Sequence, residues 1–145
     1  MKSVTAYLNF DGNCRHVMSF YRECLNAELH LNAYPDTKGQ PSSDPAARIM
    51  HSQLSHEGAP ILMASDTPPG GGSLKPGSNF SVSVHCGSVD EIERLFSALG
   101  QNGKVRMPLG NMPWGSRLGM LTDQFGIQWL LNCDLSSESS GHDNQ

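Results

Sequence analysis

Residues 121–132, LTDQFGIQWLLN, decide the fold, because they read as two short apolar runs joined at a tight turn. The turn runs from Asp123 to Gly126. Asp and Gly are residues that such a turn favours, since Gly adopts positive φ at little cost. We therefore predict a β-hairpin. Trp129 on the second run has two interpretations, as a core residue between sheet and helix or as the wall of a binding cleft.

The hairpin completes a longer pattern in the second half of the chain. An alternating strand is predicted over residues 79–86, and the helix that follows opens with Ser88 and Glu91 at the spacing of a capping box. This helix carries an apolar stripe and ends at Gly100 or Gly103. Further strands are predicted over residues 104–109, 116–123 and 126–133.

The first half of the chain shows the same order of elements. A helix begins at Cys14 after Asn13, a suitable N-cap, and Asn26 can end it in the left-handed conformation. We treat Asp66 and Asp123 as residues that end equivalent strands, where their carboxylates stabilise turns. The strands are predicted over residues 4–10, 28–34, 47–56 and 60–66.

Together these patterns predict an α+β fold of two βαβββ modules that form a curled mixed sheet with a cleft. Module 1 covers about residues 4–66 and module 2 about residues 79–133, joined by the Gly- and Pro-rich segment 67–78. Each module has a half-exposed sheet that it cannot bury alone, so both are assigned to a single domain, 1–135. Residues 134–145 are polar and Ser-rich, and we predict a flexible tail.

Composition excludes several functional classes. With a formal net charge of −4 and ten scattered basic residues, no nucleic-acid partner is expected. We find neither an apolar run long enough to cross a membrane nor a signal peptide, so a cytoplasmic protein without membrane partners is expected. The four cysteines lack C-x-x-C spacing, which favours reduced, buried thiols. Cys14 has a second interpretation as a nucleophile, because a helix start favours thiolate.

Several linked segments together resemble one known family. The chain is similar to the glyoxalase/bleomycin resistance/dioxygenase group, the vicinal oxygen chelate superfamily, and more narrowly to its PhnB-like branch. The similarity extends from about Val4 to Cys133. It is carried by YLNFDGNCRHVMSFY (7–21), ILMASD (61–66), VDEIERLFSALGQNG (89–103) and KVRMPLGNMPWGSRLGMLTDQFGIQWLLN (104–132).

The resemblance implies two open half-barrels that enclose a cleft, and a homodimer. In metal-dependent members, the first and last strands of each module each supply a His, Glu or Gln ligand to a divalent ion. Here the implied ligand positions hold residues that bind such ions poorly, and only Gln128, two residues away from the last position, could coordinate. We therefore expect no metal and no other cofactor. The positions are Ala6, Leu62 or Met63, Ser81 and Leu130.

Cleft candidates are polar or aromatic residues on the predicted strands and loops. His51 and Gln53 share one face of a strand, either lining the cleft or forming a polar stripe that faces solvent. The full set is Asn9, His51, Gln53, Met63, Trp114, Gln128 and Trp129.

These residues favour a protein that binds a small apolar or aromatic molecule in its cleft without a catalytic metal. The alternative is a lyase or dioxygenase-type enzyme with an atypical site for Ni, Zn, Mn or Fe near His51. The sequence leaves open whether any reaction is catalysed. Methyl transfer is disfavoured, because no G-x-G-x-x-G fingerprint is present.

Overall fold

The computed structural model describes residues 1–135, so residues 136–145 of the predicted tail lie outside the described part of the chain. Two compact units are present, Met1–Lys75 and Pro76–Gln145, here called unit 1 and unit 2. Their boundary falls inside the segment 67–78 that the sequence identified as a linker. Asp134 belongs to the last strand and not to a tail.

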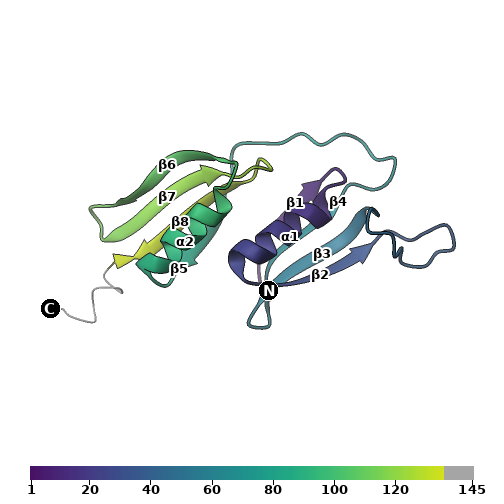
Figure 1. Cartoon of the computed structure of the whole chain (residues 1–145), viewed down its shortest axis with the longest axis horizontal. Helices are drawn as coiled ribbons and strands as arrows, with labels where there is room; N and C mark the ends of the chain where they lie inside the picture. The colour runs from purple at the N-terminus through teal and green to yellow at the C-terminus, as the bar shows by residue number, and fades with distance from the viewer. Residues whose placement is uncertain (136–145) are drawn as a thin grey trace. The chain divides into compact units, whose positions relative to one another are not determined.

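Unit 1 is one helix packed on a mixed sheet of four strands (Figure 1). Strand β1 runs parallel to β4, and the β4–β3 and β3–β2 pairs are antiparallel, in the order β1-β4-β3-β2. The elements are β1 (Tyr7–Phe10), α1 (Cys14–Leu25), β2 (Glu28–Ala33), β3 (Ile49–His56) and β4 (Ala59–Asp66).

Unit 2 repeats this topology with the order β5-β8-β7-β6, and its parallel pair is β5 with β8. The predicted α+β fold of two βαβββ modules is therefore confirmed. The elements are β5 (Val82–Cys86), α2 (Val89–Leu99), β6 (Lys104–Asn111), β7 (Ser116–Thr122) and β8 (Gln128–Asp134).

Each helix buries its apolar stripe against one face of its own sheet (Figure 1). In α1 the spacing of three and four places five side chains on one face, all buried. In α2 the corresponding buried residues are Ile92, Leu95 and Leu99. The buried α1 residues are Cys14, Val17, Met18, Tyr21 and Cys24.

The hairpin at residues 121–132 is present, and Asp123 organises its turn. Its Oδ1 accepts from the backbone N–H groups of Phe125 (2.8 Å) and Ile127 (3.0 Å). Gly126, in the connection between β7 and β8, has φ +90°, a conformation that favours glycine. Asp123 follows β7 whereas Asp66 ends β4, and β4 corresponds in sheet order to β8. The predicted equivalence of these two carboxylates is therefore wrong.

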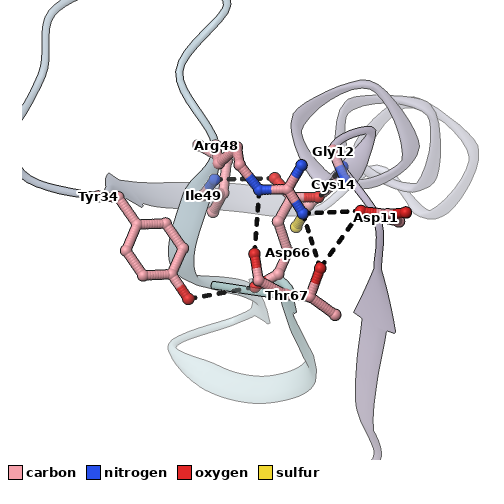
Figure 2. Close-up of polar contacts among 8 residues, drawn as sticks. All are labelled: Asp11, Gly12, Cys14, Tyr34, Arg48, Ile49, Asp66 and Thr67. Atoms are coloured by element: carbon pink, nitrogen blue, oxygen red, sulfur yellow. Dashed lines mark hydrogen bonds and ion pairs between the residues drawn. The ribbon is translucent and has the colours of Figure 1, made fainter. Parts of the chain in front are cut away.

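Helix α1 is capped from a distance. Asn13 occupies the N-cap position, but its side chain makes no capping hydrogen bond. The carboxylate of Asp66 replaces it: Oδ1 accepts from the N–H groups of Gly12 (2.7 Å) and Cys14 (2.9 Å), and Oδ2 from that of Ile49 (2.8 Å) (Figure 2). Asp66 is only 1% exposed, so one buried side chain joins the ends of β4 and β1 to the start of β3.

A guanidinium reinforces the same junction from the outside. Arg48 donates through Nε to the carbonyl of Thr67 (3.0 Å) and through Nη2 to the Thr67 hydroxyl (2.7 Å) and Asp11 Oδ1 (2.9 Å) (Figure 2). The Arg48 hydrogen bond holds the pKa of the Asp11 carboxyl below its ordinary value. Because Thr67 opens the linker segment, Arg48 anchors the point where the chain leaves unit 1.

Helix α2 is capped locally, as the sequence predicted, with one difference. Ser88 Oγ accepts from the N–H of Glu91 (3.1 Å), but the Glu91 carboxylate reaches back to the N–H of Gly87 (2.7 Å) instead of that of Ser88. The helix ends at Leu99 with Gly100 as C-cap, and Asn26 closes α1 with φ 53° and ψ 53°, the predicted left-handed conformation.

Replacing Asp66 should therefore destabilise unit 1 strongly. Asp66→Ala leaves three N–H donors without their acceptor, and we expect a loss on the order of 3 kcal/mol in the free energy of unfolding, measured by urea denaturation. Asp36→Ala is the matched control, since Asp36 also accepts two N–H bonds but lies in an exposed loop, and should cost about 1 kcal/mol or less. Equal losses in the two variants would contradict this role.

Candidate functional site

Each sheet has a face covered by its helix and a second face, here called the open face. In unit 1 the two faces alternate along β1, β2 and β4 and along β3 from His51 to Leu54, as the period of a strand requires; shifts in register interrupt the alternation at both ends of β3. Leu8, Leu54, Leu62 and Ala64 are buried on the helix-covered face. The residues between them on β1, β3 and β4 point to the open face and are more exposed.

Four of the predicted cleft candidates lie on the open face of unit 1. Met63 on β4 lies between Tyr7 on β1 and Gln53 on β3, because both are its register partners. Asn9 lies two residues beyond Tyr7 on β1, and His51 lies two residues before Gln53 on β3, so both share this face. Asn9, His51, Gln53 and Met63 therefore come together on three adjacent strands.

Tyr7 joins this group, and the sequence analysis did not select it. Its hydroxyl lies 3.0 Å from His51 Nδ1, and the two rings stack with centroids 5.8 Å apart and an interplanar angle of 26°. Its side chain is 45% exposed, so the pair stays accessible. The period-two rule applied from Asn9 would have found Tyr7 on the same strand face.

Gln53 is oriented by a neighbour on its own strand. Its amide Nε2 donates a hydrogen bond to Ser55 Oγ (3.1 Å). The amide oxygen takes no part in that bond and remains an acceptor. Gln53 also pairs in register with His30 on β2, and Asn32 on β2 pairs with His51. The open face therefore continues onto β2 with polar side chains.

The open face of unit 2 is more apolar. Leu130 on β8 pairs with Met120 on β7, and Met107 on β6 pairs with Met120, which gives a row of apolar side chains across three strands. Gln128 lies on the same face, and its amide is already used: it accepts from Arg106 and donates to the carbonyl of Phe80 (2.7 Å). Within unit 2, Gln128 therefore joins Arg106 on β6 to the segment that precedes β5.

The structure selects the core interpretation of Trp129. Its side chain is 1% exposed on the helix-covered face with Leu131, and the indole N–H donates to Asp123 Oδ2 (2.8 Å). It therefore does not lie on the open face. Trp114 is 72% exposed in the loop between β6 and β7, where Gly115 with φ +91° shapes the turn. Neither tryptophan joins the group around His51.

The strand faces also locate the positions where the family resemblance implies metal ligands. Leu62 is buried under α1, which leaves Met63 as the open-face residue of β4. Ala6 precedes β1, and alternation places Tyr7 on the open face instead.

In unit 2, the open face of β5 carries Ser83 and His85, and that of β8 carries Leu130 between Gln128 and Asn132.

The side chains on these strand faces do not fit the divalent-ion site that the family resemblance implies for metal-dependent members. The open faces of β1, β4, β5 and β8 carry one imidazole, that of His85, and one carboxylate, that of Asp134 at the exposed end of β8. Their other oxygen and nitrogen donors are amides and hydroxyls. Among residues 1–135, no group of three or more His, Cys, Asp and Glu side chains is placed to hold a metal.

The cysteines show the properties of core residues. Burial raises the pKa of the Cys14 thiol to about 11, and likewise that of Cys86 to about 11. Cys14 Sγ lies 3.5 Å from Ser52 Oγ, which donates its own proton to the carbonyl of Ala64 (2.7 Å). The thiol must then be the donor to Ser52, so it is protonated. This environment favours the core interpretation over a nucleophile.

The class of protein follows from the duplicated βαβββ topology and its two open sheet faces. The family model of the Glyoxalase/Bleomycin resistance protein/Dioxygenase superfamily matches residues 6–131, and the chain belongs to this superfamily. Its relative YjdN of Escherichia coli K12 is 30% identical over 140 residues, covering 89% of this chain and 93% of YjdN.

Solved structures place the chain near the PhnB-like branch. The crystal structure of PA1353 from Pseudomonas aeruginosa is 36% identical, with a TM-score of 0.77, and the match covers 92% of this chain and 98% of PA1353. A PhnB protein from Bacillus cereus, described as a putative 3-demethylubiquinone-9 3-methyltransferase, is 25% identical with a TM-score of 0.72, covering 91% and 99% of the two chains.

The core role of Trp129 yields a prediction. Trp129→Phe removes the donor to the buried Asp123 carboxylate and should lower the free energy of unfolding by about 2 kcal/mol. Trp114→Phe, at an exposed position, is the control and should change it by less than about 0.5 kcal/mol. Thermal and urea denaturation measure both. A more stable Trp129→Phe variant would contradict the assignment.

The raised thiol pKa values yield a second prediction. Iodoacetamide at pH near 8 should leave Cys14 and Cys86 unmodified in the folded protein and alkylate both in urea. Because these pKa values rise from 9.0 to about 11 on folding, the unfolded chain loses protons first, and stability should fall as pH rises through that interval. Rapid alkylation of folded Cys14, read by mass spectrometry, would restore the nucleophile interpretation.

Proposed function

We propose that this protein binds a small apolar or aromatic molecule without a catalytic metal, and that the open sheet faces supply the binding residues. The observation that carries the proposal is the group of Tyr7, Asn9, His51, Gln53 and Met63 on adjacent strands of unit 1. An aromatic ring, a thioether and several oriented polar groups suit a ligand that is mostly apolar with a few hydrogen-bonding atoms.

The open face of unit 2 supports the same proposal. Leu118, Met120 and Leu130 are partly exposed there, and apolar side chains that a fold leaves partly exposed favour contact with apolar ligands. The side chains at the four implied ligand positions argue against the metal-dependent alternative, because lyase and dioxygenase-type members need hard donors around the ion and none of these positions holds a carboxylate or an imidazole. Methyl transfer, named for the Bacillus cereus relative, gains no support from a chain without a G-x-G-x-x-G fingerprint.

Two further parts of the proposal concern the state of the protein. We expect a homodimer, for which the molar mass in solution is the test, and a cytoplasmic location without nucleic-acid or membrane partners. Among the described residues, no helix is both long and apolar enough to cross a lipid bilayer.

Titration with an aromatic probe tests the binding proposal. Adding indole to isotope-labelled protein should shift the NMR signals of Tyr7, His51 and Met63 saturably and leave those of buried Trp129 unchanged. Met63→Glu should weaken binding on the order of tenfold, because the apolar probe then meets a charge. Met112→Glu, in the loop between β6 and β7, is the matched control and should bind like the unaltered protein.

A metal test separates the proposal from its alternative. Metal-stripped protein should show no saturable thermal shift with Ni²⁺, Zn²⁺ or Mn²⁺, and elemental analysis of purified protein should find no stoichiometric ion. A stoichiometric ion, or a large shift that His51→Gln abolishes, would favour the lyase or dioxygenase-type enzyme near His51.

A further inference from the structure

The Tyr7–His51 pair has hydrogen-bonding capacity that the fold does not use. Tyr7 and His51 come from β1 and β3, 44 residues apart in sequence, and their 3.0 Å contact is the only hydrogen bond of either side chain within residues 1–135. Because β4 lies between these strands in the sheet, the two side chains reach across β4 to form their contact. The contact therefore lies over the centre of the group on the open face.

The proton count of this pair determines what it can offer a ligand. A neutral imidazole has one N–H and one bare nitrogen, and a phenol has one O–H and oxygen lone pairs. If the Tyr7 hydroxyl donates to Nδ1, then Nε2–H is the remaining donor and the Tyr7 oxygen the remaining acceptor. If Nδ1–H donates to Tyr7, the hydroxyl is the remaining donor and Nε2 the acceptor. In both arrangements one donor and one acceptor are left.

The surroundings add an apolar platform and a further acceptor. The stacked rings and the Met63 thioether give flat apolar contact, and Gln53 adds its amide oxygen, since its nitrogen is bound to Ser55. Arg and Lys are absent from β1, β3 and β4, the strands that carry the pair and Met63. A ligand carboxylate would therefore find no permanent cation on these strands.

We propose that the Tyr7–His51 pair is the polar anchor of the open face of unit 1, and that it takes an uncharged aromatic ligand whose polar group carries a donor and an acceptor side by side, such as a carboxamide or lactam. This proposal rests on the proposed small-molecule function. A carboxamide matches the donor and the acceptor of the pair in both of its arrangements. A carboxylate has acceptors only, and an unsubstituted ring leaves both groups of the pair unsatisfied.

Three ring compounds of similar size separate these cases: benzamide, benzoate and toluene. Titrations followed by NMR at pH near 8 should show benzamide binding on the order of tenfold more tightly than the other two. Tyr7→Phe and His51→Gln should each reduce benzamide affinity to about that of toluene and leave toluene affinity unchanged. His56→Gln, an exposed histidine at the end of β3, is the matched control and should change neither.

The possible outcomes distinguish the anchor from the binding function. If toluene and benzamide bind equally, or if the benzamide preference survives both Tyr7→Phe and His51→Gln, the anchor is overturned while small-molecule binding stands. If benzoate binds most tightly, the anchor recognises a carboxylate and the ligand class is overturned. If none of the three compounds shifts the open-face signals, the proposed function fails together with the anchor. Tyr7 is 45% exposed, so Tyr7→Phe should fold, which its melting temperature verifies.

Discussion

The carboxylate of Asp66 is the interaction on which unit 1 depends. It accepts three backbone N–H bonds, one before α1, one in its first turn and one at the start of β3, while it remains buried itself. The Asn13 side chain makes no capping hydrogen bond, so the Asp66 carboxylate accepts from the start of α1 in its place. A single side chain at the end of β4 thereby holds the ends of β1 and β3 in place, and with them the strands that carry Tyr7 and His51.

The candidate site follows from this arrangement. Tyr7 is three residues from the end of β1, and Met63 is three residues from Asp66 on β4, so the register set at the junction also places the open-face group. A slip of one residue would turn every side chain of a strand to the opposite face. The same alternation turns Leu62 inward and Met63 outward, and it leaves the strand positions expected to hold metal ligands without carboxylates.

The two units share a topology but use it differently. Unit 2 caps its helix locally through Ser88 and uses its buried aspartate, Asp123, to build a turn and to bind Trp129. A row of leucine and methionine crosses the middle of its open face, whereas in unit 1 Met63 lies between Tyr7 and Gln53 on the open face. The same topology therefore occurs twice in the chain, with different side chains on the two open faces.

By itself the sequence determined the order of helices and strands, the turn at Asp123 to Gly126, the left-handed Asn26 and the duplication, because these depend on residues a few positions apart with periods of 2 and 3.6. The sequence also identified Asn9, His51, Gln53 and Met63 as candidate ligand-binding residues. Only the tertiary structure shows that Tyr7 contacts His51 and that Asp66 caps α1. It alone also shows that the Trp129 side chain is buried in the core. The physical reason is that the partners in these contacts are set by strand register and helix packing, which no single segment encodes.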